Sequence, residues 1–292
     1  MLKLSIIMPA YNEERAIASL LINIHIVLEK QYRRNEYEII VVDDGSTDST
    51  SKVAQDNGAH IIKHPYNIGN GSAIKTGMRA AHGEIILLMD ADGQHDPNYI
   101  PQLIKPLDQY DMAVGARMSW TQTPPHRKLA NMFYNAFSSY LVNRKILDLT
   151  SGFRAIRASV AKRYIYLLPN SFSYPSTLTM SLSRSGHSIT YVPIELKPRL
   201  SKSKINLLSD GVRFIMIIMK IATFFNPLRI FVPTSLFCFA IGMGHATYKI
   251  LIRHEKYTGF SLLFITTAVT IFLMGLIAEQ ITQLRFERSE EH

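Results

Sequence analysis

Short apolar runs alternate with helical patterns along most of the chain. Strands are predicted at about residues 4–8, 39–42, 59–63, 84–89, 112–115 and 188–193. Between the first four of these strands, apolar residues recur at helical spacing over about residues 13–29, 47–56 and 72–81. Pro97 is expected to begin another helix. Such alternation is typical of βαβ units. We therefore predict an α/β domain with a mostly parallel sheet.

Two longer apolar segments follow near the C-terminus, at residues 230–248 and 260–278, and neither contains a charged residue. Each is about long enough to cross a hydrocarbon core of ~30 Å as a helix. Small residues, which let packed helices approach closely, occur in both: Gly242, Gly244, Ala246 and Gly275. We expect a transmembrane hairpin. The alternative is a pair of buried core helices.

The segment between the predicted domain and the hairpin is basic and amphipathic. Residues 197–204 form a polar basic stretch that is expected to be a loop, and residues 207–225 mix apolar side chains with Asp210, Arg213 and Lys220 before Pro227. That pattern indicates an interfacial amphipathic helix, with an ordinary core helix as the alternative. The predicted division is therefore a domain over residues 1–206, an interfacial helix over 207–227, and the hairpin with a short tail over 228–292.

Acidic residues follow two of the predicted strands directly. The apolar run 85–89 is followed by Asp90, Asp92 and Gln94, and the run 39–42 is followed by Asp43 and Asp44. The carboxyl ends of strands in an open α/β sheet face the ligand crevice. Two carboxylates and an amide suit Mg²⁺ or Mn²⁺ shared with a substrate diphosphate. The alternative is turn chemistry that caps the helix at Pro97.

Charge narrows the class of partner. The chain of 292 residues has a formal net charge of +9. Its basic residues are not interleaved with aromatic side chains as in a nucleic-acid platform, so we expect no nucleic-acid partner. Several precede the first apolar segment, where anionic lipid headgroups would attract them: Lys197, Arg199, Lys202, Lys204, Arg213, Lys220 and Arg229. A lipid phosphate or a membrane surface is the expected partner.

The glycine-rich segment 67–77 matches neither the dinucleotide nor the P-loop pattern. It predicts the start of a helix whose backbone amides could face the crevice, with Lys75 reaching a phosphate. The alternative is a flexible helix start without a ligand.

Four motifs in order, together with the hairpin, resemble glycosyltransferase family 2. They are S-I-I-M-P-A-Y-N-E at residues 5–13, V-V-D-D-G-S at 41–46, M-D-A-D-G-Q-H at 89–95 and T-S-G-F-R at 150–154. More narrowly, the chain resembles the dolichyl- and polyprenyl-phosphate sugar synthases. It departs from their pattern in the basic loop, where R-L-S-K-S-K at 199–204 lacks a glycine.

The resemblance implies a GT-A fold and a set of site residues. The residues implied to bind the donor are Pro9, Tyr11, Glu13, Val42, Asp44, Ala91 and Asp92. Those implied to bind the metal, Mg²⁺ or Mn²⁺, are Asp90, Asp92 and Gln94. Besides Asp92, the catalytic residues implied are the arginines near the phosphates, Arg117, Arg127 and Arg199.

The activity implied is inverting transfer of a hexose from a GDP- or UDP-sugar to a dolichyl or undecaprenyl phosphate. Because nucleotide sugars are cytoplasmic, the catalytic domain is expected on the cytoplasmic face, although Lys249, Arg253 and Lys256 between the spans oppose positive-inside counting. Homo-oligomerisation is left open. The alternatives are a family 2 enzyme with another glycan or lipid acceptor, and a non-catalytic subunit that binds nucleotide or lipid. The single tryptophan, Trp120, does not lie in the Q-x-x-R-W motif expected of processive polysaccharide synthases.

Overall fold

The computed structural model describes residues 2–117, 125–170, 173–197, 223–254 and 259–290. Contacts within the chain divide it into two compact units. One comprises residues 1–140 with 144–204, and the other comprises residues 141–143 with 205–292. The first unit contains the α/β fold and the second contains the C-terminal apolar helices.

A mostly parallel sheet forms the centre of the first unit. Its seven described strands are β1 (Leu4–Ala10), β2 (Tyr37–Asp43), β3 (His60–Lys63), β4 (Ile85–Leu88), β5 (Met112–Arg117), β6 (Arg154–Arg157) and β7 (Ile189–Ile194). Their spatial order is β3-β2-β1-β4-β6-β5-β7. Only β6 among these runs against its neighbours, β4 and β5. The predicted α/β class and mostly parallel sheet are confirmed.

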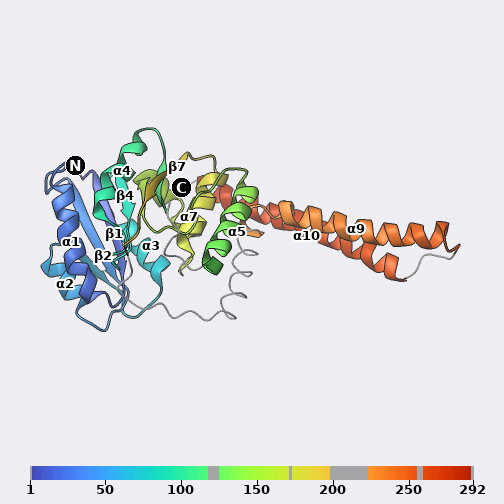
Figure 1. Cartoon of the computed structure of the whole chain (residues 1–292), viewed down its shortest axis with the longest axis horizontal. Helices are drawn as coiled ribbons and strands as arrows, with labels where there is room; N and C mark the ends of the chain where they lie inside the picture. The colour runs from blue at the N-terminus through green and yellow to red at the C-terminus, as the bar shows by residue number, and fades with distance from the viewer. Residues whose placement is uncertain (1, 118–124, 171–172, 198–222, 255–258, 291–292) are drawn as a thin grey trace. The chain divides into compact units, whose positions relative to one another are not determined.

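Helices cover both faces of this sheet (Figure 1). They are α1 (Glu14–Leu28), α2 (Thr50–Asp56), α3 (Asn70–Ala80), α4 (Ile100–Ile104), α6 (Ala158–Arg163) and α7 (Tyr174–Arg184), while α5 (Pro125–Val142) follows β5 in the chain. Because successive strand residues point to opposite faces, Ile6 and Met8 of β1 pack in the cluster under α1, whereas Ile7 packs in the cluster under α3. The sheet is therefore buried on both sides, and only its edges and strand ends can present a site.

The prediction of a single helix beginning at Pro97 is wrong in detail. The chain forms a 3₁₀ turn at Pro97–Tyr99, the short α4, and a second 3₁₀ turn at Lys105–Asp108. Pro101 and Pro106 lack the N–H that a continuous helix would need, which explains the breaks. The cap at the start is Asp96, whose side chain accepts from the Asn98 amide. Capping is therefore not the task of Asp90 or Asp92.

The short strand β6 was not predicted from the sequence. The strand begins and ends with arginine. Arg154 is completely buried, although a charged residue is expected to be exposed. By inserting between β4 and β5, this strand brings the T-S-G-F-R segment to the end of β4. A Cβ atom built on Gly152 would lie only 2.6 Å from Oδ2 of Asp90.

The second unit contains the two apolar helices, α9 (Leu228–Leu251) and α10 (Gly259–Glu290). Candidate membrane spans cover Leu228–Leu251 and Gly259–Leu284, and only 17% of each span's most apolar window is buried. That low burial argues against core helices of a soluble protein. The helices pack closely at Gly242 and Gly275, where a Cβ would lie 2.9 Å from Ile265 and 2.6 Å from Phe231. Gly244 has no such close neighbour within the described residues.

Most of the predicted basic loop and interfacial helix, over residues 198–222, lies outside the described residues. The break expected at Pro227 is present: residues 223–225 are helical, and Pro227 caps the start of α9.

Candidate functional site

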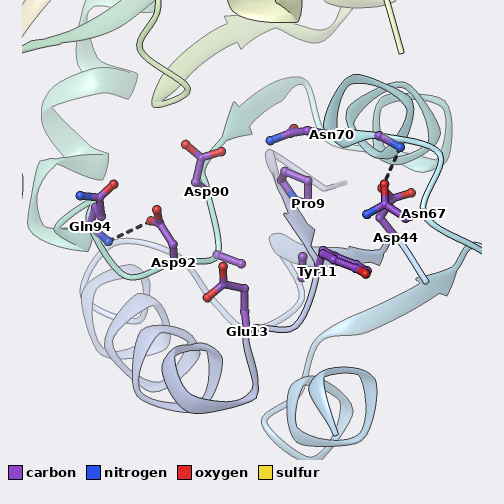
Figure 2. Close-up of a pocket in the computed structure, with 12 residues that line it drawn as sticks. Pro9, Tyr11, Glu13, Asp44, Asn67, Asn70, Asp90, Asp92 and Gln94 are labelled. Atoms are coloured by element: carbon purple, nitrogen blue, oxygen red, sulfur yellow. Dashed lines mark hydrogen bonds between the residues drawn. The ribbon is translucent and has the colours of Figure 1, made fainter. Parts of the chain in front are cut away.

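A pocket opens at the carboxyl ends of β1, β2 and β4 (Figure 2). The parallel register pairs Ala10 with Asp43 and Ile7 with Leu88, so the three strands end close together. The lining residues are Pro9, Ala10, Tyr11, Glu13, Asp44, Asn67, Gly69, Asn70, Asp90, Ala91, Asp92 and Gln94. The structure thus gathers most of the residues predicted for donor and metal binding. Val42 is the exception, because it is fully buried in the sheet and does not line the pocket.

One end of the pocket is acidic. Asp90 and Asp92 follow β4, and Glu13 lies just before α1, where its backbone amide donates to Thr50 Oγ1 at 2.8 Å. The Asp92 carboxylate accepts from the Gln94 amide at 3.1 Å. The Lys197 amide donates to the Gln94 carbonyl at 2.9 Å, and Lys197 Nζ pairs with Asp96 at 3.3 Å. The segment after β7 therefore holds the loop that carries Asp92 and Gln94.

The oxygen donors at this end fit a hard divalent cation. Carboxylates and an amide oxygen are ligands that Mg²⁺ and Mn²⁺ accept, usually with phosphate oxygens and water completing the shell. Among the described residues, no group of three or more His, Cys, Asp or Glu side chains is gathered tightly enough to hold a metal alone. Two carboxylates and one amide leave coordination positions open, which suits an ion shared with a diphosphate.

The other end of the pocket is organised around Asp44, which is 3% exposed. His64 Nδ1 bonds Asp44 Oδ1 at 2.7 Å, and the Ile68 and Gly69 amides donate to Oδ1 and Oδ2 at 3.0 and 2.8 Å. His64 Nε2 in turn bonds Thr76 Oγ1 at 2.9 Å. Its neighbour Asp43 instead holds the turn, accepting from the Ser46 amide at 2.8 Å.

His64 was missed in the sequence, although a signal was present. It follows β3 directly, at the same sheet edge where Asp44 follows β2, and its amide donates to the Asp43 carbonyl. The strand-end rule that identified the aspartates therefore applies to His64 as well.

Lys75 has another partner than the phosphate considered from the sequence. Its ammonium donates to Asn170 Oδ1, and the Ser72 amide donates to the Asn170 carbonyl at 3.1 Å. These bonds join α3 to the loop before α7.

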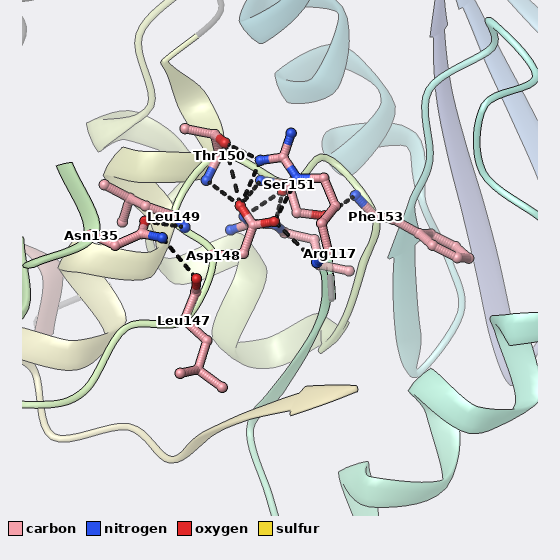
Figure 3. Close-up of polar contacts among 9 residues, drawn as sticks. Arg117, Asn135, Leu147, Asp148, Leu149, Thr150, Ser151 and Phe153 are labelled. Atoms are coloured by element: carbon pink, nitrogen blue, oxygen red, sulfur yellow. Dashed lines mark hydrogen bonds and ion pairs between the residues drawn. The ribbon is translucent and has the colours of Figure 1, made fainter. Parts of the chain in front are cut away.

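At the end of β5, Arg117 forms an ion pair with the buried carboxylate of Asp148 (Figure 3). Its Nε and Nη2 donate to the two oxygens of Asp148 at 2.7 and 2.8 Å, and Nη2 also donates to Thr150. Burial favours a raised pKa for Asp148, but the hydrogen bonds and charge of Arg117, with backbone amides, hold the pKa of this carboxyl below its usual range. The pair stabilises the start of the T-S-G-F-R segment, because Asp148 also accepts from the Thr150 and Ser151 amides.

Arg154, in the same segment, was missed as a site-supporting residue. Its guanidinium donates to the carbonyls of Ser151 and Pro175 and to the hydroxyl of Thr179. Asp148 and Asp90 are close enough to stabilise its charge. Of the other predicted arginines, Arg127 lies in the first turn of α5 without a described side chain, and Arg199 lies outside the described residues.

His95 is buried between the acidic loop and the T-S-G-F-R segment. Its ring stacks on Phe153 with 4.9 Å between centroids, and its Nδ1 has no hydrogen-bond partner among the described residues. Burial lowers the pKa of His95 to about 4, a shift that the charge of Arg117 supports and that of Asp92 opposes. The ring is therefore neutral in the folded protein near pH 7.

We expect acid to destabilise the first unit through His95. The unfolded chain takes up a proton near the ordinary pKa of about 6.5, while the folded protein takes it up only near 4, so stability falls as pH falls through this window. The loss at the lower end is about 3 kcal/mol. Thermal unfolding followed by circular dichroism in chelator, from about pH 7 to about pH 4.5, should show a flatter slope for His95→Phe. The exposed His60→Gln variant serves as the control, and a His95→Phe slope equal to that of the wild type would contradict the assignment.

Comparison with known proteins assigns the class. A family model described as Glycosyl transferase family 2 matches residues 5–165, more than half of the chain, and one described as GtrB C-terminal hairpin matches residues 226–284. The protein is a glycosyltransferase whose α/β unit is followed by a hairpin of this type. The chain belongs to glycosyl transferase family 2.

Relatives extend over nearly the whole chain. It is 28% identical over 297 residues to the undecaprenyl-phosphate 4-deoxy-4-formamido-L-arabinose transferase of Photorhabdus laumondii, covering 97% of this chain and 89% of that protein. It is 26% identical over 221 residues to the dolichyl-phosphate hexose transferase of Haloferax volcanii, covering 75% and 93%. Among solved structures, glucosyl-3-phosphoglycerate synthase of Mycobacterium tuberculosis, in complex with Mn²⁺, UDP and phosphoglyceric acid, matches with a TM-score of 0.59 at 21% identity, covering 76% and 78%. That likeness shows the GT-A-like fold.

Proposed function

We propose that the chain transfers a hexose from a nucleotide sugar to a polyprenyl phosphate, with inversion at the anomeric carbon, at the cytoplasmic face of a membrane. The observation that carries the proposal is the combination, in one chain, of an acidic pocket at the sheet edge and a hairpin of two exposed apolar helices. The names of the relatives support the same acceptor class.

The donor end of the proposal rests on the lining residues. Pro9, Tyr11 and Asp44 hold the nucleoside, while Glu13 and Ala91 border the diphosphate, so that the reacting sugar is held in one position. Asp90, Asp92 and Gln94 would hold Mg²⁺ or Mn²⁺, which when bound neutralises charge on the departing nucleoside diphosphate.

The acceptor needs orientation more than activation. A monoester phosphate has a second pKa of about 6, so it is largely ionised near neutral pH and can attack the anomeric carbon without a strong general base. Arg127 and Arg199 are assigned to orient this phosphate, since a guanidinium presents paired donors to phosphate oxygens. Arg117 stays a predicted phosphate contact, and its guanidinium is bound to Asp148 in this structure.

Product analysis with the full chain in detergent tests the proposal. Radiolabelled UDP- and GDP-hexoses are each incubated with undecaprenyl or dolichyl phosphate and Mg²⁺ or Mn²⁺, and lipid extracts are separated by thin-layer chromatography. We expect one donor to yield a labelled lipid that requires the polyprenyl phosphate, with the anomeric configuration opposite to that of the donor. Label in a polymer, or no labelled lipid with any donor, would favour another acceptor or a non-catalytic subunit.

A further inference from the structure

Arg154 places a positive charge in the interior of the first unit, where its guanidinium is completely buried. Nε and Nη2 donate to the Ser151 carbonyl at 3.0 and 2.5 Å, and Nη1 donates to the Pro175 carbonyl at 2.8 Å and to Thr179 Oγ1 at 2.9 Å. All of these acceptors are neutral. Among the described residues, no carboxylate forms an ion pair with Arg154.

The charge of Arg154 is balanced from a distance by two carboxylates. Burial lowers the pKa of Arg154, and the neighbouring groups that oppose this shift are Tyr174, Asp148, Tyr191 and Asp90. Burial raises the pKa of both tyrosines, so neither is charged near pH 7, whereas an arginine stays protonated. The negative charge near Arg154 therefore comes from Asp148 and Asp90, and Asp148 gives both of its oxygens to Arg117.

The register of the sheet places Arg154 beside the acidic end of the pocket. Arg154 pairs with Leu88 in the antiparallel ladder between β4 and β6. Continuing that register by two residues puts Gly152 opposite Asp90, and a Cβ on Gly152 would indeed lie 2.6 Å from Asp90 Oδ2. The buried guanidinium is therefore two residues from the backbone that the Asp90 carboxylate touches.

A positive charge in this position acts on a cation and on a diphosphate in opposite directions. Arg154 does not line the pocket, so no ligand has to displace it. Because buried charges are screened little by salt and the interior has a low dielectric constant, its field extends into the pocket. That field repels a divalent cation bound at Asp90 and attracts the negative phosphate oxygens that would share the cation.

We propose that Arg154 is a fixed counter-charge behind the metal site, which weakens binding of Mg²⁺ or Mn²⁺ alone and so makes the ion bind together with the donor's diphosphate. The inference rests on the proposed function in one respect, because it takes Asp90, Asp92 and Gln94 as ligands of the ion. Arg154 is not a catalytic residue, since it lies outside the pocket lining. One consequence is that the ion leaves with the nucleoside diphosphate after transfer.

Calorimetry on the full chain in detergent, without lipid acceptor, tests the sign of this effect. Mn²⁺ is titrated alone and in the presence of saturating UDP or GDP. Arg154→Gln keeps hydrogen-bond donors but removes the charge, and it should bind Mn²⁺ alone at least about tenfold more tightly than the wild type. The further gain in Mn²⁺ affinity from added nucleoside diphosphate should be smaller than in the wild type. Unchanged or weaker binding of Mn²⁺ alone by a folded Arg154→Gln protein would overturn the proposal.

Two further variants separate charge from structure. Arg154→Lys keeps the charge and loses the planar fork, so it should bind Mn²⁺ alone as weakly as the wild type. A merely structural role predicts that both substitutions weaken Mn²⁺ binding, because both disturb the backbone at Gly152. Arg157→Gln is the matched control: it lies at the other end of β6, donates to the carbonyls of Leu107 and Tyr110, and should leave the Mn²⁺ affinity unchanged.

If Arg154→Gln does not fold, the stability of Asp90→Asn in excess chelator decides. Removing the Asp90 charge leaves the buried guanidinium less well balanced, so thermal unfolding should begin at a lower temperature than in the wild type. Asp92→Asn should not lower it, because an asparagine oxygen can still accept from the Gln94 amide and one repulsive charge is removed from the acidic end. Equal melting temperatures for Asp90→Asn and the wild type would contradict the balance between Arg154 and Asp90.

These results can be told apart from failure of the proposed function, because no lipid acceptor is present in either measurement. Tighter binding of Mn²⁺ by Arg154→Gln, without any lipid-linked product from the wild type, would leave the counter-charge standing and refute the acceptor. Lipid-linked product from the wild type, with weaker Mn²⁺ binding by Arg154→Gln, would do the reverse.

Discussion

Asp92→Ala should reduce sugar transfer at least about 30-fold while the protein stays folded. Removing one hard ligand from a site with so few protein ligands should cost at least ~2 kcal/mol of transition-state stabilisation, comparable to the loss of one oxyanion donor. Asp92 lies on the pocket wall and not in the core, so its loss leaves the packing intact. Initial rates of lipid-linked product, with circular dichroism as the check on folding, measure the effect.

Asp96→Ala is the matched control, because Asp96 lies in the same loop but does not line the pocket. It caps the turn at Pro97 and pairs with Lys197, so its loss should lower stability and spare most of the transfer rate. Full turnover in excess chelator, or by a well-folded Asp92→Ala protein, would contradict the metal assignment.

Gly152→Ala is expected to weaken binding of Mn²⁺ together with the donor's nucleoside diphosphate, UDP or GDP, by about tenfold or more, a cost that corresponds to one lost ligand or hydrogen bond. The added methyl group would lie 2.6 Å from Oδ2 and 3.1 Å from Cγ of Asp90, so the carboxylate has to turn away from its position at the end of β4. Because the displaced atoms are the end of a side chain, the fold should tolerate the change. Calorimetry reports the affinity, and the transfer rate should fall with it.

Gly77→Ala is the control variant, because it should affect stability and not ligand affinity. A Cβ there would lie 2.3 Å from Cγ2 of Ile7 inside the core, so stability should fall while the affinity for Mn²⁺ and the nucleoside diphosphate per folded molecule is retained. An unchanged affinity for Gly152→Ala would show that Asp90 does not depend on this close approach.

Much of the fold was predictable because periodicity reports burial. The predicted strands correspond to β1 to β5 and β7, since a sheet covered on both faces needs nearly continuous apolar runs. β6 escaped because its burial depends on Arg154, whose charge is accommodated by carbonyls from Ser151 and Pro175. No local pattern carries that information.

Site residues that directly follow a strand could be predicted from the sequence. Residues whose role depends on a contact with a distant part of the chain could not. Asp44, Asp90 and Asp92 were identified from their positions after strands, and the structure places all three on one pocket. The pairing of Arg117 with Asp148 joins residues far apart in the chain. His64 could have been identified by the same rule as Asp44, but its bond to that carboxylate is a tertiary contact.

The insertion of β6 between β4 and β5 also dictates the order in which the protein can assemble. Strands β1 to β4 can pair once residue 88 has emerged from the ribosome, but β5 has no neighbour to join on that side until residues 154–157 emerge. Pairings so distant in sequence form late and slowly. During translation, the half-sheet ending at β4 therefore has an open edge, and the Asp90 end of the pocket lacks its Gly152 wall. Chaperone protection would matter most in this interval, before either apolar helix has been made.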